Sequence, residues 1–333
     1  MRAMLWDREP DGTLSCGLCA HACRLREGAH GRCGVRVNVR GEMVTLVGDV
    51  VTAIQLDPVE KKPLYHFLPG TKTYSIGSAG CNFHCRHCQN HKIAHVRPKS
   101  VIPGRRATPD TLARLAAQQA PSMAFTYNEP TVFFEQVYET AGQAQARGLK
   151  VILVSNGFMT EDFLLPLSRR VNAANIDLKA FSEEFYHKYC GGRLRPVLDN
   201  LKLIKRLGWW LEVTTLVIPG CNDSPQELRD MARFIRDELG PDTPWHLTAF
   251  HGAAMMAAHP STPLFQLEDA WRTGREEGLR YVYIGNTTGL IGSSTLCPSC
   301  GTPVIERRGY QTRLGRTPGI CPSCKTSIPG VWQ

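Results

Sequence analysis

The stretch that decides the fold is GCNFHCRHCQN, residues 80–90, which directly follows the strand-like run YSIGSA at residues 74–79. Its three cysteines, Cys81, Cys85 and Cys88, have the spacing C-x3-C-x2-C. Thiolates are the ligands of iron–sulfur clusters, and three of them leave one iron of a [4Fe–4S] cluster without a protein ligand. That iron is then free to bind a second molecule. A zinc site or a chance grouping of cysteines is the alternative, because a short motif needs structural context to be specific.

Strand-like and helical runs alternate along the chain after this loop. Strand-like runs cover residues 123–127, 150–155, 174–178, 211–218, 245–250 and 281–284, and helical stretches lie at 109–119, 131–147, 160–170, 197–207, 224–238 and 266–278. This alternation predicts an α/β fold with a parallel sheet and outer helices. Six or seven strands predict a partial (β/α)6 barrel of the TIM type, in which functional residues lie at the carboxyl ends of the strands.

The segments outside this repeat divide the chain into three predicted domains. Residues 1–70 form a cysteine-rich amino-terminal segment with short strands, two of them within residues 43–57. Residues 71–288 form the partial barrel. Residues 289–333 form a tail with four cysteines that resembles a zinc ribbon.

The cysteines point to metal rather than to disulfides. The chain has 13 cysteines, and all but Cys190 and Cys221 fall into three tight groups. Disulfide frameworks belong to small secreted domains, whereas grouped cysteines in a cytosolic enzyme favour metal binding. We find no apolar run of about twenty residues that would span a membrane, and no apolar signal-peptide core at the start. We therefore predict a cytoplasmic protein without membrane contact.

The formal charge of +9, from 39 basic and 30 acidic residues, suggests an acidic partner such as nucleic acid. Metal-bound cysteines are thiolates, however, and each filled site adds negative charge. With one three-cysteine and two four-cysteine sites filled, ligand counting lowers the net charge to about +4. Most of the basic balance therefore comes from counting cysteines as neutral.

The tail carries two C-P-S-C knuckles separated by twenty residues. Four thiolates at this spacing predict a closed tetrahedral zinc site, with the ligands Cys297, Cys300, Cys321 and Cys324. A rubredoxin-like iron is the chemical alternative, since a four-sulfur tetrahedron suits either metal.

The amino-terminal group has the less regular spacing C-x2-C-x3-C-x9-C, with the cysteines Cys16, Cys19, Cys23 and Cys33. Zinc and an auxiliary [4Fe–4S] cluster are both open for this group. His21 and His30 lie nearby in the sequence and could replace a cysteine.

Several motifs along the whole chain resemble the radical S-adenosylmethionine (SAM) enzymes of the AmmeMemoRadiSam system, which are relatives of the pyruvate formate-lyase activating enzymes. The resemblance rests on the cysteine motif and on TYNEPTVF (126–133), SNGF (155–158), NIDLKAFSEEFYHKYCGG (175–192), EVTTLVIPGCNDS (212–224), PWHLTAFH (244–251) and YVYIGN (281–286). It implies that the open iron of the cluster binds SAM.

The resemblance also implies SAM contacts at the ends of two strands. Asn128 and Glu129 match the motif that holds the SAM amino group. Ser155 and Asn156 match the position that meets the ribose and carboxylate. Glu129 has an alternative role as the cap of the next helix, and the run Ser155-Asn156-Gly157 is also compatible with an ordinary turn.

Three further residues are implied at the SAM site. Asp177 and Lys179 alternate along a strand and share a face. Opposite charges inside an apolar strand need a partner, because a buried charge is costly on its own. The resemblance implies that both contact SAM, and a mutual ion pair is the alternative. His251 matches a strand-end histidine near SAM, and the loop at residues 252–256, which departs from the family's pattern, lies at the predicted substrate mouth.

The resemblance implies an enzyme in which a one-electron reductant protein reduces the cluster. SAM is then cleaved to a 5′-deoxyadenosyl radical, which abstracts hydrogen from a substrate that the sequence does not identify. The first hypothesis is an activase-like enzyme that acts on a protein, or on a small molecule together with Memo-like and AMMECR1-like partner proteins. An RNA-modifying enzyme and a non-catalytic iron–sulfur module are the alternatives. Nucleic acid is not favoured, because the chain has no RNA-reading motif.

Overall fold

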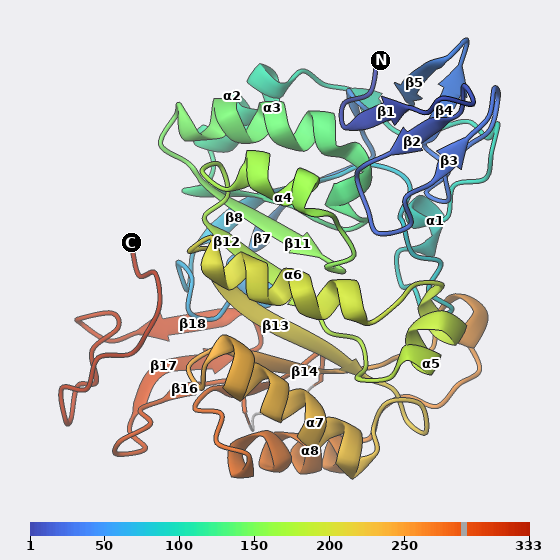
Figure 1. The fold of residues 1–333 in the computed structure, drawn as a ribbon. Coiled ribbons are helices and arrows are strands. Elements are labelled where there is room, and N and C mark those ends of the chain that lie inside the picture. Colours follow the sequence, from blue (N-terminus) through green and yellow to red (C-terminus); the bar gives the residue numbers. More distant parts are fainter. Residues whose placement is uncertain (288–291) are drawn as a thin grey trace.

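The computed structural model describes residues 1–287 and 292–333, and its centre is a single mostly parallel sheet (Figure 1). Within these residues, eight strands pair in the order β15-β14-β13-β12-β11-β10-β8-β7. Seven of them run parallel, namely β8 (Lys72–Gly77), β10 (Ser122–Phe125), β11 (Lys150–Ser155), β12 (Ala173–Asp177), β13 (Trp210–Val217), β14 (Trp245–Ala249) and β15 (Val282–Gly285). The predicted α/β class is confirmed.

Helices follow the strands and cover the outer face of the sheet (Figure 1). The longer ones are α2 (Pro109–Ala117), α3 (Phe134–Gln145), α4 (Glu161–Leu167), α6 (Arg195–Arg206), α7 (Pro225–Phe234) and α8 (Leu264–Glu276). Thr108, Thr160 and Ser224 begin α2, α4 and α7, because each side chain accepts a hydrogen bond from the backbone N–H three residues later. No described helix has the length and hydropathy needed to span a bilayer.

Strand residues alternate between the helices and the barrel interior, as the two-residue period of a strand requires. In β11, Val151 and Leu153 belong to the large core under the helices. Ile152 and Val154 instead pack in a second cluster inside the barrel. Side chains at the inward positions are therefore the ones that reach an interior site.

Residues 59–70 close the amino end of the barrel interior around a buried carboxylate. Glu212 of β13 accepts hydrogen bonds from the backbone N–H groups of Tyr65 (2.9 Å) and His66 (2.8 Å) and from Trp210 Nε1 (2.9 Å). His246 Nε2 lies 2.6 Å from Glu212 Oε2. Burial opposes the charged form, but His246 and these N–H groups lower the pKa of Glu212 overall. Glu212 therefore ties residues 59–70, called the plug below, to the sheet.

The run at residues 43–57 differs from the prediction, because it contains parts of three strands instead of two. These strands are β5 (Glu42–Thr45), β6 (Val50–Val51) and β7 (Ala53–Pro58). The third joins the barrel sheet and pairs antiparallel with β8 over its whole length. The amino-terminal segment thus supplies one edge of the sheet.

Smaller sheets occupy the two ends of the chain. At the amino terminus these are β1 (Trp6–Arg8), β2 (Leu14–Cys16) and β3 (Arg24–Leu25), followed by a hairpin of β4 (Arg36–Val39) and β5, while β6 pairs with β9 (Arg105–Arg106). The tail forms β16 (Thr295–Leu296), β17 (Pro303–Arg308) and β18 (Gln311–Leu314). The tail lies at the amino ends of the barrel strands, whereas the short helices α1 (His91–Ala94) and α5 (Glu183–Phe185) lie at the carboxyl ends (Figure 1). The predicted boundary between residues 288 and 289 falls at the residues outside the described part, and the domain limits stay predictions.

A chain of buried hydrogen bonds ties the tail to the barrel. Arg307 Nη1 donates to Thr295 Oγ1 (2.9 Å), which lies 2.8 Å from the Tyr283 hydroxyl. His66 Nε2 lies 2.6 Å from that hydroxyl, and His66 Nδ1 lies 2.7 Å from the carbonyl oxygen of Pro329. A neutral His66 satisfies both contacts, donating through Nδ1 and accepting through Nε2. Burial lowers the pKa of His66 to about 4.

We predict that His66 makes the folded state sensitive to acid. The unfolded chain binds the proton near pH 6.5 and the folded chain only near pH 4, so stability falls as the pH drops through this window. At pH 5 the loss due to His66 is roughly 2 kcal/mol relative to pH 8. In the variant His66→Gln, the unfolding free energy should therefore decrease less between pH 8 and pH 5 than in the parent, by the contribution of His66. The exposed His187→Gln should retain it, and an equal pH dependence in His66→Gln and the parent would contradict the prediction.

Candidate active site

The central cysteine loop lies at the carboxyl ends of the barrel strands and forms one wall of a cavity. The cavity has a volume of about 270 Å³. Nine residues predicted from the sequence line it together: Cys81, Cys85, Cys88, Asn128, Glu129, Ser155, Asn156, Asp177 and Lys179. They come from the ends of β8, β10, β11 and β12, which are neighbours in the sheet.

Asn128 fixes the start of the cysteine loop. Its Oδ1 accepts from the backbone N–H of Ser78 (2.9 Å), and its Nδ2 donates to the carbonyl oxygen of Gly80 (2.8 Å). Gly80 has a φ of +89°, and a Cβ there would lie 2.8 Å from the carbonyl oxygen of Cys33. Glycine is therefore required where the amino-terminal segment meets the loop.

Glu129 is buried below the loop and accepts four hydrogen bonds. Its Oε1 accepts from the N–H (3.1 Å) and hydroxyl (2.6 Å) of Thr131 and from the Ser155 hydroxyl (2.7 Å), and its Oε2 accepts from the Asn156 N–H (2.9 Å). The contact with Thr131 is the helix-start role considered above, here for the short 3₁₀ turn Pro130–Phe133. Burial raises the pKa of Glu129 despite these bonds. A contact to SAM stays a prediction.

Asn156 joins the end of β11 to the cysteine loop. Its Nδ2 donates to Asn82 Oδ1 at 2.7 Å and lies 3.8 Å from the sulfur of Cys81. Asn82 in turn donates to the carbonyl oxygen of Phe158 at 3.0 Å. These amide contacts hold the first cysteine of the motif against the neighbouring strand end.

Asp177 and Lys179 form an ion pair at the cavity wall. Lys179 Nζ lies 2.8 Å from Asp177 Oδ2. Burial alone would lower the pKa of Lys179, but Asp177 and the nearby sulfurs of Cys85 and Cys190 raise it well above its usual value. The mutual pair considered as the alternative is thus present, and both side chains also face the cavity.

Two residues near the central cysteines, His87 and Cys190, were assigned no role from the sequence. Ligand atoms of Cys85, His87 and Cys190 lie within 4.8 Å of one another. A hydrogen bond from Cys190 lowers the pKa of Cys85 against the opposing effect of burial. His87 lines the cavity, and its buried Nδ1 has no hydrogen-bond partner among the described residues. His87 lies inside the motif itself, whereas Cys190 comes from the π-helical turn Tyr186–Cys190 and carries no spacing signal.

The structure does not bring His251 to this cavity. Among the described residues, those that line the cavity include Thr248 of β14 but not His251. The strand ends at Ala249, and the exposed His251 lies with Nε2 3.1 Å from the carbonyl oxygen of Asn286. His251 therefore lies outside the residues that line this cavity, and its contact with SAM stays a prediction.

The loop at residues 252–256 packs against the central cysteine loop. The backbone N–H of Met255 donates to the carbonyl oxygen of Arg86 at 2.9 Å. The Met255 side chain is 71% exposed. The predicted substrate mouth thus carries an exposed apolar side chain beside the cysteines.

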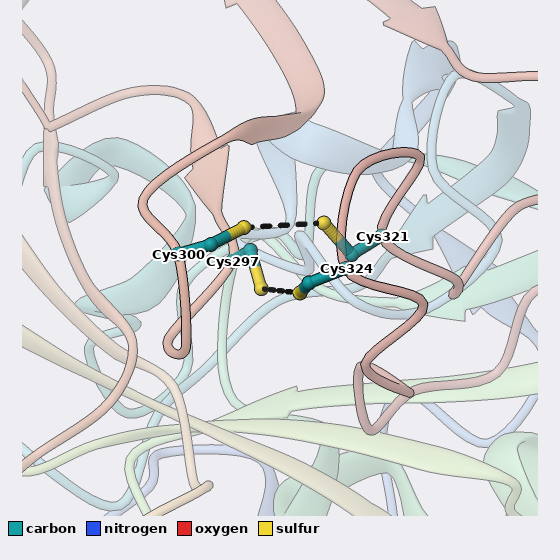
Figure 2. A group of neighbouring side chains, drawn as sticks. All are labelled: Cys297, Cys300, Cys321 and Cys324. Atoms are coloured by element: carbon teal, nitrogen blue, oxygen red, sulfur yellow. Dashed lines mark hydrogen bonds between the residues drawn. The ribbon is translucent and has the colours of Figure 1, made fainter.

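The four tail cysteines converge on one point. Figure 2 shows them facing each other in two pairs, with Sγ–Sγ distances of 3.5 Å for Cys297 and Cys324 and 3.6 Å for Cys300 and Cys321. All four sulfurs lie within 4.8 Å of one another. Tetrahedral zinc with Zn–S bonds of about 2.3 Å places thiolate sulfurs about 3.8 Å apart. The tail cysteines therefore fit a single metal ion.

The amino-terminal cysteines are arranged differently. Cys16, Cys23 and Cys33 surround Cys19 closely enough to raise its pKa further, beyond the larger effect of burial. Among the described residues, however, no three of them have sulfurs all within 4.8 Å of one another. His21 and His30 are not part of a ligand group here, since His21 Nε2 lies 2.8 Å from the carbonyl oxygen of Asn82 and His30 Nδ1 lies 3.3 Å from that of Gly34.

Comparisons with known proteins concern the family and the fold of this chain. Residues 75–235 match the sequence profile of the radical SAM superfamily. An uncharacterized protein of Methanocaldococcus jannaschii is 40% identical over 313 residues, which cover 94% of this chain and 93% of that protein. The structure of Streptococcus suis SuiB bound to S-adenosylmethionine has a similar fold, with a TM-score of 0.50 and 12% identity over 68% of this chain and 52% of SuiB. A domain of a pyruvate-formate lyase-activating enzyme from Bacteroides vulgatus matches 49% of this chain and 98% of its own length, with 15% identity and a TM-score of 0.44.

Proposed function

Because the chain belongs to the radical SAM superfamily and is therefore an enzyme, we propose that it cleaves SAM reductively at a [4Fe–4S] cluster held by Cys81, Cys85 and Cys88. When bound, the cluster supplies one electron to SAM, which yields methionine and a 5′-deoxyadenosyl radical for hydrogen abstraction. One observation carries this proposal: the three cysteines share a single cavity with six polar residues that the resemblance assigns to SAM.

The residues present fit such a cluster. Three sulfur donors face one cavity, which leaves one iron of a four-iron cluster without a protein ligand. The unpartnered Nδ1 of His87 lies buried in the same wall and offers a polar contact for a bound molecule. Asn128 and Gly80 hold the loop so that the cysteine side chains reach the cavity.

The polar residues of the cavity fit the amino-acid part of SAM. That part carries an ammonium and a carboxylate, and the cavity presents the carboxylates of Glu129 and Asp177 and the ammonium of Lys179. Opposite charges at fixed positions can orient such a zwitterion. Ser155 and Asn156 lie next to Glu129 and offer a hydroxyl and an amide to the ribose or the carboxylate.

For the substrate we propose a protein or a small molecule that partner proteins deliver, as in an activase. The resemblance to activating enzymes supports this. A one-electron reductant protein, the Memo-like and AMMECR1-like partners and a cytoplasmic location belong to the same proposal.

For the tail we propose a structural zinc ion. The four sulfurs are close enough for one tetrahedral ion and leave no coordination position for water or substrate. The tail packs on the plug of the barrel, where Arg307 Nη2 donates to the carbonyl oxygen of Tyr65 at 2.6 Å. Zinc would thus stabilise the amino end of the barrel, opposite the central cysteine loop.

The function is tested by SAM cleavage. Reconstituted protein with SAM and dithionite under anaerobic conditions should form 5′-deoxyadenosine, detected by mass spectrometry. Cys85→Ala should abolish it, because two thiolates do not hold a site-differentiated cluster. Cys221→Ser, a cysteine outside the three groups, should act like the parent. A Cys85→Ala variant that forms the product at the parent rate would show that the cysteines are wrongly assigned.

Asp177→Asn separates SAM binding from a purely structural ion pair. We expect the affinity for SAM, measured by equilibrium titration, to weaken by about tenfold or more, because Lys179 loses its partner and the cavity loses a carboxylate. The cluster absorbance should persist. Asp199→Asn is the matched control, since it removes a surface ion pair in which Arg195 Nε lies 3.0 Å from Asp199 Oδ2. Unchanged SAM affinity with a lower melting temperature would leave only the structural role.

Removal of two tail ligands tests the zinc site. Cys321→Ser combined with Cys324→Ser should reduce zinc by about one ion per chain and disorder the tail, because metal binding supplies on the order of 10 kcal/mol in small zinc modules. The central iron should be unchanged, and the barrel should stay folded with a lower melting temperature. Metal analysis that shows loss of iron instead of zinc would contradict the assignment.

A further inference from the structure

We propose that Cys16, Cys19, Cys23 and Cys33 hold a second [4Fe–4S] cluster, which takes electrons from a one-electron donor protein and passes them to the central site. The existence of this cluster is independent of the proposed function, whereas the direction of electron transfer rests on it. Four observations carry the proposal: the spacing of the sulfurs, the N–H groups around them, a buried arginine and the contact with the central loop.

The spacing distinguishes this group from the tail. A single zinc ion draws four sulfurs to about 3.8 Å from one another, and the tail pairs at 3.5 Å and 3.6 Å fit that arrangement. In a [4Fe–4S] cluster each thiolate binds its own iron, so the sulfurs lie farther apart. The amino-terminal sulfurs are gathered around Cys19, yet no three of them lie within 4.8 Å of one another in the described structure. Cys81, Cys85 and Cys88 share this wider spacing.

Backbone N–H groups two residues after a cysteine act on the sulfur in both groups. The N–H of His21 lowers the pKa of the Cys19 thiol and the N–H of Val35 lowers the pKa of the Cys33 thiol, in each case against the larger effect of burial. In the central loop the N–H of Phe83 lies 3.4 Å from the sulfur of Cys81, again two residues later in the chain. Hydrogen bonds to cysteine sulfur are among the features that set the potential of an iron–sulfur cluster.

Arg36 adds a buried cation beside the group. Its side chain is almost completely buried, with Nη1 3.8 Å from the sulfur of Cys16, and Nη2 pairs with Glu135. Its Nε is buried and has no hydrogen-bond partner among the described residues. An unsatisfied donor at this depth is costly unless a further acceptor is present. Thiolate and inorganic sulfur of a bound cluster would be such acceptors.

The two cysteine groups are in direct contact. A Cβ on Gly80, the residue before Cys81, would lie 2.8 Å from the carbonyl oxygen of Cys33. His21 Nε2 lies 2.8 Å from the carbonyl oxygen of Asn82, the residue after Cys81. The two cysteine loops therefore pack against each other at residues 80–82, which places the proposed second cluster next to the central site.

The transfer is balanced and breaks no bond. A reduced flavodoxin or ferredoxin gives up one electron, the amino-terminal cluster is reduced and then reoxidised, and the central cluster is reduced by one electron. The donor protein reaches the amino-terminal group because Cys23 and Cys33 are partly exposed. No proton has to move in these steps.

Metal and sulfide content of the full chain after anaerobic reconstitution tests the site. We expect about eight irons and eight sulfides in the parent, and about four of each in the variant Cys81→Ala, Cys85→Ala, Cys88→Ala. After reduction, that variant should show one [4Fe–4S]⁺ signal by EPR. Loss of essentially all iron and sulfide, with zinc in their place, would overturn the proposal. If the triple variant does not fold, the sulfide content of the parent protein is decisive. About eight sulfides per chain support the second cluster, and about four refute it.

The relay is tested with two electron donors. In Cys23→Ser combined with Cys33→Ser, formation of 5′-deoxyadenosine with reduced flavodoxin should fall about tenfold or more relative to the rate with dithionite in the same preparation. Cys221→Ser should keep the parent ratio. An unchanged ratio in a double variant that has lost the second cluster would overturn the relay. If no preparation cleaves SAM with either donor, the proposed function fails, while the iron and sulfide counts still decide whether the second cluster exists.

Discussion

Parallel pairing of β8, β10, β11 and β12 is the constraint on which the candidate site depends. The strands are hydrogen-bonded in sequence order, so their carboxyl ends meet at one edge. Each end delivers a short polar segment to the same cavity. Asn128 then links two of these ends directly, since its side chain bonds to Ser78 and Gly80. Residues about 100 positions apart in the sequence become one site because the sheet leaves them no other arrangement.

Two buried carboxylates at opposite ends of the barrel show how the surroundings decide their charge. Glu212 lies next to His246, and its pKa is lowered despite burial. Glu129 receives its hydrogen bonds in the described structure from hydroxyl and backbone N–H groups, and burial raises its pKa. The hydrogen bonds to Glu129 favour its charged form, but the effect of burial is larger. Glu129 is therefore the carboxylate that would gain most from a bound ammonium, as the proposed contact to SAM requires.

The alternation of apolar side chains made most of the fold predictable. The expected strand at residues 150–155 coincides with β11, whose inward and outward residues differ in the clusters they join. The sequence does not reveal that β7 joins the barrel sheet, because its alternating pattern predicts a strand but not the strand with which it pairs. The strand β17, with the sequence PVIERR, was missed because its charged residues hide the strand period.

The same contrast holds for the site. The three central cysteines and the polar strand ends were identified, whereas His87 and Cys190 lie inside quoted motifs but were assigned no role. Only the structure shows that a turn distant in sequence brings Cys190 to Cys85 and His87. His251 was assigned to SAM by resemblance alone, and it follows the end of β14 outside the residues that line the cavity. The backbone N–H of Phe250, which precedes it, donates to the hydroxyl of Thr262 at 2.8 Å.

Identical side chains lie at different spacings in this protein because of the turns that carry them. The tail knuckles bring four sulfurs to the spacing of one ion. At the amino terminus the turns are set by Ala22, with a φ of +45°, and Gly34, with a φ of +77°, and the sulfurs stay farther apart. A Cβ on Gly34 would lie 2.4 Å from the carbonyl oxygen of Val96, so this turn is fixed by packing on the segment that follows the central loop. Sequence spacing alone left zinc and an iron–sulfur cluster open for this group, because spacing constrains the length of chain between ligands but not the distance between their sulfur atoms.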